Sequence, residues 1–197
     1  MPRLEYFFDY VSPFSYLADT QLPAVVERTG TEIVYRPFFL GGVFQASKNS
    51  PPVTVPNKGK YLFADITRWT NRYGVEINPN PYFPVNTLHA MRAAVAALGD
   101  KRFRDFHRAM FRGVWVEGKN LADEAVLRAA IDAAGLDGAA ILARAKEAEV
   151  KDTLRRNSDE AVERGAFGAP TFFIGDEMFW GNDRLDFVEE ALRNSPS

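Results

Sequence analysis

Strand-forming patterns occupy the two ends of this chain, and the long stretch between them has the pattern of helices. Near the N-terminus, short runs rich in aromatic and β-branched residues cover 4–10 and 31–39, with a helical pattern between them. Near the C-terminus, APTFFIG and EMFWG predict two strands joined at Gly175-Asp176, and the helical segment LDFVEEAL follows. Residues 86–164 show helical periodicity with few strand signals. The predicted order is therefore β-α-β, a helical block, and β-β-α.

This order predicts an α/β protein with a thioredoxin-like fold that is interrupted by a large all-helical insertion. We assign residues 1–75 and 165–197 to the thioredoxin-like domain and 76–164 to the inserted helical domain. Ser12 suits the N-cap of the first helix, Pro13 its first position, and Gly30 its end. Residues 40–57 are expected to form a loop, and 61–73 a short helix. Asn182 or Asp183 is expected to cap the last helix.

The composition excludes several kinds of chemistry. The chain has no cysteine, so it cannot form a disulfide framework, a thiolate metal site or a redox centre from its own sulfur. Only two histidines are present, and no metal site is expected. A formal charge of −2 offers no field for nucleic acid or an anionic membrane. No apolar run is long enough to span a membrane, and we expect a cytoplasmic protein.

Two short motifs carry the candidate chemistry. In DYVSPFSYLA, Ser12 and Ser15 stand where one type of redox protein carries a C-x-x-C pair. In GAFGAPT, Pro170 follows small residues just before a predicted strand, which is where thioredoxin-like folds place a cis peptide. The backbone of Ala169 would then pair with the backbone of a bound cysteine-containing peptide.

The motifs SPFSYLA, RPFFLGGVFQASKN, NKGKY, GAFGAPT and FWGNDR together resemble the bacterial 2-hydroxychromene-2-carboxylate isomerases. These are glutathione-dependent enzymes, related to kappa-class glutathione transferases and more distantly to DsbA-type oxidoreductases. The resemblance covers nearly the whole chain. It implies that glutathione is the cofactor and that Ser12 is the catalytic residue, donating a hydrogen bond to the glutathione sulfur. It also implies a homodimer, because the relatives are typically dimers.

The resemblance implies further site residues. Asn49 and Lys58 would contact the glycine end of glutathione, and Asn182 and Asp183 would hold its γ-glutamyl end, with Asp183 paired to the ammonium. Kappa enzymes often have serine where this chain has Asn182. Packing and backbone contacts to glutathione would come from Phe167, Ala169 and Pro170. The aromatic substrate is expected in an apolar pocket among Phe39, Phe83, Asn86, Trp115 and Trp180.

Each of these residues also has a plain structural interpretation. Ser12 can be an N-cap without a catalytic role, Asn49 a turn residue, and Lys58 a solvated surface lysine. Asp183 can be a helix cap, and His89 and His107 are typical packing or surface residues of helices.

The resulting prediction is an isomerase that interconverts 2-hydroxychromene-2-carboxylate and trans-o-hydroxybenzylidenepyruvate in aromatic catabolism of the naphthalene type. One alternative is a kappa-class-like glutathione S-transferase, which consumes glutathione and releases a conjugate. The other is a non-catalytic thiol-peptide binding module on the same fold. Product analysis separates the isomerase from the transferase, because an isomerase returns its thiol unchanged.

Overall fold

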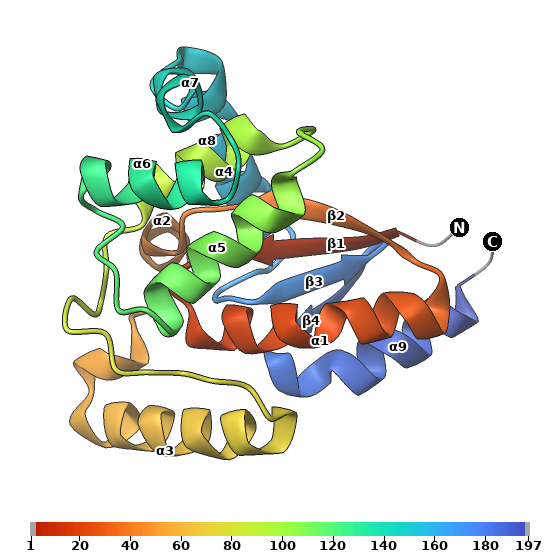
Figure 1. The fold of residues 1–197 in the computed structure, drawn as a ribbon. Helices are drawn as coiled ribbons and strands as arrows, with labels where there is room; N and C mark the ends of the chain where they lie inside the picture. Colours follow the sequence, from red (N-terminus) through yellow and green to blue (C-terminus); the bar gives the residue numbers. More distant parts are fainter. Residues whose placement is uncertain (1–2, 196–197) are drawn as a thin grey trace.

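The computed structural model describes residues 3–195, and its centre is a four-stranded mixed sheet covered by helices on both faces (Figure 1). The N-terminal part supplies β1 (Arg3–Phe8), α1 (Pro13–Thr29) and β2 (Glu32–Pro37). The C-terminal part supplies β3 (Thr171–Ile174), β4 (Glu177–Trp180) and α9 (Leu185–Asn194). The strand order is β2-β1-β3-β4; β1 is parallel to β2 and antiparallel to β3, and β3 is antiparallel to β4. This confirms the thioredoxin-like prediction.

A mainly helical segment connects β2 to β3. It contains α2 (Leu40–Ala46), a 3₁₀ turn (Pro52–Thr54), α3 (Pro56–Tyr73), α4 (Leu88–Ala97), α5 (Phe103–Trp115), α6 (Glu124–Ala133), α7 (Gly138–Arg144) and α8 (Ala148–Glu163). The helical insertion is thus confirmed, whereas the domain boundaries at 75–76 and 164–165 stay predictions. One hydrophobic cluster is shared by the sheet and the inserted helices. Within residues 3–195, no helix is long and apolar enough to cross a membrane.

The alternation of side chains along β1 divides the core into two layers. Leu4, Tyr6 and Phe8 belong to the larger cluster, which also includes residues of α1, α5 and α9. Figure 1 shows α1 and α9 side by side on that face of the sheet. Phe7 points to the opposite face and joins a smaller cluster with residues of α2 and α8, including Val43. The four buried side chains of β1, Leu4, Tyr6, Phe7 and Phe8, are apolar and serve both faces, whereas Arg3 and Glu5 at its start are charged.

The segment 40–57 differs from the predicted loop. It contains α2 and the 3₁₀ turn, and α3 begins at Pro56 rather than near residue 61. The N-cap residue of α2, Phe39, makes no side-chain cap bond. Instead the Asp9 carboxylate accepts a hydrogen bond from the Leu40 N–H at 2.9 Å. A helix capped from another element, with two glycines in its first turn, carries no local start signal.

Most other local predictions are confirmed. Ser12 is the N-cap of α1, Pro13 is its first residue, and Gly30 ends it with a positive φ of 66°. Gly175 and Asp176 connect β3 to β4 as expected. The capping prediction for α9 is wrong, because its N-cap is Arg184 and residues 182–184 form a 3₁₀ turn.

Candidate active site

Ser12 lies where β1 ends and α1 begins, and its hydroxyl is held by two hydrogen bonds. The Ser12 Oγ accepts from the Ser15 N–H at 3.1 Å and donates to the Ala169 carbonyl oxygen at 3.0 Å. The turn before it is closed by the Ser12 N–H, which donates to the Asp9 carbonyl oxygen at 3.0 Å. Because α1 is 17 residues long, its dipole adds positive potential at this hydroxyl. Ser12 is only 4% exposed.

The loop that faces Ser12 contains the predicted cis bond between Ala169 and Pro170. Its conformation is held by the Thr171 hydroxyl, which donates to the Gly168 carbonyl oxygen at 2.8 Å. Gly168 is required here by a close approach, because a Cβ at this position would lie 2.6 Å from the Trp180 Nε1. The carbonyl oxygen of Ala169 in this loop is the acceptor of the Ser12 hydroxyl.

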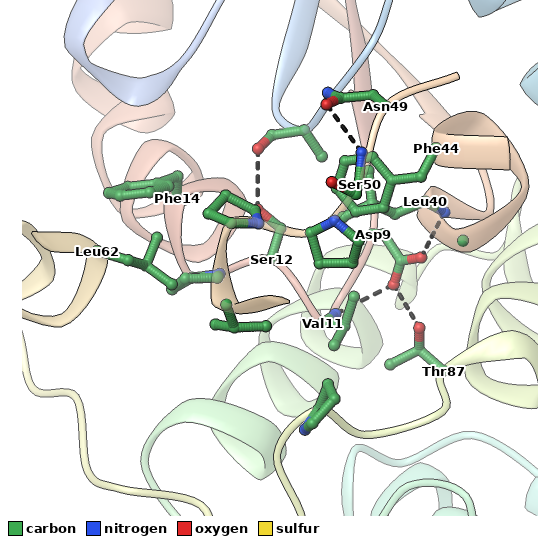
Figure 2. Close-up of a pocket in the computed structure, with 18 of the residues that line it drawn as sticks. Asp9, Val11, Ser12, Phe14, Leu40, Phe44, Asn49, Ser50, Leu62 and Thr87 are labelled. Atoms are coloured by element: carbon green, nitrogen blue, oxygen red, sulfur yellow. Dashed lines mark hydrogen bonds between the residues drawn. The ribbon is translucent and has the colours of Figure 1, made fainter. Parts of the chain in front are cut away.

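A cavity of about 470 Å³ lies beside Ser12 and the cis-proline loop (Figure 2). Its lining is mainly apolar and includes Val11, Phe14, Phe44 and Val53. Of the residues predicted from the sequence, those brought together around it are Ser12, Phe39, Asn49, Lys58, Phe83, Asn86, Phe167, Ala169 and Trp180. Residues from the loop after β1, from α1, α2 and α3, and from the cis-proline loop therefore meet at one apolar cavity with a hydroxyl on its wall.

A second cavity, also of about 470 Å³, adjoins the first. The two share Lys58, Ala169 and Trp180, and the second is also lined by Asn182 and Asp183. Except for Pro170, the predicted glutathione residues are thus distributed along one continuous surface with Ala169 common to both parts.

The polar residues of this surface are engaged to different degrees. The Asn49 side chain donates to the Phe167 carbonyl oxygen at 3.0 Å, tying the loop after α2 to the cis-proline loop. Asp183 pairs with Arg184 at 2.7 Å on the exposed surface. The Lys58 ammonium is exposed, and no carboxylate of the described residues lies within ion-pair distance of it. Lys58 is therefore available to a ligand carboxylate.

Asn182 differs from the others, because it is 3% exposed. Its side-chain Nδ2 donates to the Tyr73 hydroxyl at 3.4 Å, and that hydroxyl donates to the Asn182 carbonyl oxygen at 3.1 Å. The pKa of Tyr73 is raised by burial, and the bond from Asn182 acts against this rise. Asn182 thus joins the end of α3 to the turn before α9.

Trp115 does not line either cavity, contrary to the sequence prediction. It is 4% exposed, its indole N–H donates to the Tyr10 carbonyl oxygen at 2.8 Å, and its ring lies 5.5 Å from that of Phe83. It therefore supports Phe83 from behind. Pro170 is buried and is likewise not part of the lining. His107 is buried and hydrogen-bonded to Tyr10 and Asp19, outside both cavities.

Asp9 is a site residue that the sequence analysis did not select. Its carboxylate lines the first cavity and is fully buried, and it accepts hydrogen bonds from the Thr87 hydroxyl, the Leu40 N–H and the Val11 N–H at 3.1 Å (Figure 2). Burial raises its pKa, and the three hydrogen bonds act against this rise. The available signal was an acid at the end of a buried apolar strand, three residues before the Ser12-Pro13 helix start.

Comparison with known proteins agrees with this geometry. A family model described as the DSBA-like thioredoxin domain matches residues 3–193. The chain belongs to this family. It is 35% identical to a 2-hydroxychromene-2-carboxylate isomerase of Sphingobium xenophagum, over 96% of this chain and 97% of that protein. It is 28% identical to glutathione S-transferase kappa 1 of Rattus norvegicus, over 97% of this chain and 91% of that protein.

The solved structures extend the comparison to the fold. A solved structure of 2-hydroxychromene-2-carboxylate isomerase superposes with a TM-score of 0.87 at 28% identity, covering 98% of this chain and 95% of that chain. A probable DsbA oxidoreductase of Streptomyces coelicolor, at 21% identity, superposes with a TM-score of 0.78 over 100% of this chain and 93% of that chain. The second likeness concerns the fold alone, since a chain without cysteine cannot perform disulfide exchange with its own sulfur.

Proposed function

We propose that this protein is a glutathione-dependent isomerase that interconverts 2-hydroxychromene-2-carboxylate and trans-o-hydroxybenzylidenepyruvate. The observation that carries the proposal is the Ser12 hydroxyl, which lies at a helix N-terminus beside an apolar cavity in a chain without cysteine. The relatives named isomerases support the reaction, and those named glutathione transferases support the cofactor. Glutathione would supply the nucleophile that the protein lacks.

Glutathione would lie along the surface that joins the two cavities. Its thiol would lie near Ser12, and its peptide backbone beside Ala169, which lines both cavities. The free ammonium of Lys58 suits the glycine carboxylate, and Asp183 suits the γ-glutamyl ammonium. Asn49 would act chiefly by holding the cis-proline loop, because its amide already donates to the Phe167 carbonyl oxygen.

The first requirement of the reaction is an ionised thiol. A free thiol has a pKa of about 8.5, and lowering it by about two units requires about 2.7 kcal/mol of preferential stabilisation of the thiolate. A hydrogen bond to a charged group contributes about 1.5–3 kcal/mol. A helix N-terminus adds about 0.3–1 kcal/mol. The Ser12 hydroxyl and the N-terminus of α1 can therefore supply the necessary stabilisation together.

The second requirement is rotation about a carbon–carbon double bond. In the ring form that bond is held cis, and in the open product it is trans. The ring form is a cyclic hemiketal without a free ketone, so it must open first: the hemiketal hydroxyl loses its proton, the ring C–O bond breaks, and the released phenol oxygen takes up a proton. The thiolate then adds to the resulting cis enone, a C–S bond forms, and the electron pair of the double bond moves to the carbonyl oxygen as an enolate. Rotation follows about the new single bond. The enolate then re-forms the double bond and expels the thiolate, so glutathione is regenerated. Apolar walls around Phe39, Phe83 and Trp180 suit the aromatic ring.

The test is an ultraviolet absorbance assay of 2-hydroxychromene-2-carboxylate with purified protein, with and without glutathione. We expect fast approach to the isomer equilibrium only with glutathione, and no loss of free thiol. Loss of thiol with formation of a conjugate would instead indicate a transferase. Glutathione binding without conversion of either kind would indicate a thiol-peptide binding module.

A further inference from the structure

The Ser12 hydroxyl has one proton to donate, and in this structure that proton is already engaged in a hydrogen bond. It is donated to the Ala169 carbonyl oxygen at 3.0 Å, while the oxygen itself accepts from the Ser15 N–H at 3.1 Å. The proposed isomerase needs the same O–H group to donate a hydrogen bond to the glutathione sulfur. A hydroxyl cannot donate one proton fully to two acceptors, so the bond to Ala169 must be given up when the thiolate forms.

The contacts of Ser12 make this change a rotation and not a rearrangement. The Ser15 N–H and the backbone of the α1 N-terminus fix the position of the oxygen. The proton can swing about the Cβ–Oγ bond while that cap remains intact, because hydroxyl hydrogens rotate freely among acceptors. The thiolate can therefore accept the hydrogen bond from Ser12 without movement of α1 or the cis-proline loop.

The rotation leaves the Ala169 carbonyl oxygen without a donor. Within residues 3–195, the Ser12 hydroxyl is the only group that donates to this oxygen. A ligand that fills the cavities displaces water from Ala169, and an unpaired buried carbonyl is unfavourable. The ligand must therefore bring its own N–H to Ala169 if Ser12 is to turn toward the sulfur.

We propose that thiol activation at this site is a donor exchange, which rests on the function proposed above. An amide N–H of the ligand replaces the Ser12 hydroxyl on the Ala169 carbonyl, and the released hydroxyl proton turns to the sulfur. The exchange itself changes no covalent bond, and the thiol ionises by giving its S–H proton to solvent water. A cysteinyl residue suits the exchange because its N–H and its sulfur are three bonds apart, and here the two protein atoms that they meet are 3.0 Å apart. The site thus selects thiols with an amide N–H on the carbon next to the CH₂–S group.

The experiment compares glutathione with its depsipeptide analogue, in which an ester oxygen replaces the cysteinyl N–H and the shape is nearly kept. The pKa of each bound thiol is measured at saturation by thiolate absorbance and compared with that of the same thiol free in solution. In the unmodified protein, we expect binding to lower the pKa of the glutathione thiol by at least about one unit more than the pKa of the analogue thiol. This is a tenfold difference in the effect on the ionisation constant. In the Ser12→Ala variant, the two ligands should show the same change.

Three results would overturn the exchange. The first is an equal pKa decrease for both ligands in the unmodified protein, and the second is a difference of unchanged size in Ser12→Ala. The third is glutathione that binds without any decrease in the pKa of its thiol, which also refutes the proposed function. Conversely, the expected pattern of pKa values without conversion of 2-hydroxychromene-2-carboxylate supports the exchange and refutes the isomerase alone.

Discussion

Replacement of Ser12 by alanine should affect both stability and thiol ionisation, and the two effects can be separated. The variant loses the N-cap bond to the Ser15 N–H, which is worth about 1 kcal/mol. It also loses the buried bond to the Ala169 carbonyl, worth about 1 kcal/mol. The free energy of unfolding should therefore fall by about 2 kcal/mol. At about 2–4 °C per kcal/mol for a chain of this size, Tm should fall by about 4–8 °C.

Ser15→Ala is the matched stability control. The Ser15 hydroxyl is buried one turn further along α1, and it has no hydrogen-bond partner among the described residues. Removing it breaks no bond, so the free energy of unfolding should not decrease. Thermal unfolding of both variants checks the pair. An unchanged Tm in Ser12→Ala, or an equal decrease in both variants, would contradict the hydrogen bonds described for Ser12.

The catalytic effect of Ser12→Ala should depend on pH. Loss of a hydrogen bond to the thiolate, worth about 1.5–3 kcal/mol, raises the pKa of the bound thiol by about one to two units. Isomerase kcat at pH 7 should fall about 3- to 25-fold with the thiolate fraction, and the deficit should shrink as pH rises above the pKa of the free thiol. Ser12→Thr, which keeps a hydroxyl, should recover most of the loss. A lower Tm with an unshifted pH–rate profile would show that Ser12 is a cap and nothing more.

Four other variants test the rest of the site. Because burial raises the pKa of Asp9 above its ordinary 3.8, Asp9 contributes most to stability below that pH and less as pH rises through the folded-state pKa. The difference in unfolding free energy between the unmodified protein and Asp9→Asn should therefore decrease from about pH 4 toward neutrality in denaturant titrations, and a constant difference would contradict it. Lys58→Met and Asp183→Asn should each weaken glutathione binding about 5- to 10-fold by calorimetry, more at low salt, without changing the pKa of the bound thiol. Gly168→Ala should displace the Trp180 ring, since its Cβ would meet the indole N–H at 2.6 Å, and raise KM for the aromatic substrate several-fold; an unchanged KM would place that substrate elsewhere.

The features that the sequence predicted well depend on neighbours in the chain. Ser12, Pro13 and Gly30 mark the ends of α1 because capping uses residues within one turn of the helix end. The cis bond at Pro170 was predicted from small residues immediately before a strand. Such signals lie within a few positions of the structure that they specify, so the fold class could be predicted from the sequence.

The features that were missed depend on contacts between distant segments. The start of α2 is capped by Asp9, which is 31 positions away from Leu40 in the chain. The indole of Trp115 is bound to the carbonyl of Tyr10, 105 positions away, and this bond holds the ring out of the cavity. No local pattern reports either bond. The sequence could therefore place aromatic residues near the site without showing which of them line it.

A buried acid, Asp9, lies in the cavity where the thiolate is expected. A second anion beside the sulfur would raise the pKa of the thiol, which is the opposite of what the proposed reaction needs. Asp9, however, accepts bonds from Val11, Leu40 and Thr87, and these donors compensate its charge locally. Burial raises the pKa of the Asp9 carboxyl, so this environment disfavours the charged form of Asp9. The Ser12 hydroxyl and the N-terminus of α1 instead favour the charged form of the thiol. The cavity thus disfavours the charged form of the Asp9 carboxyl and favours the charged form of the glutathione thiol. Nucleophilic addition by the glutathione sulfur requires this difference.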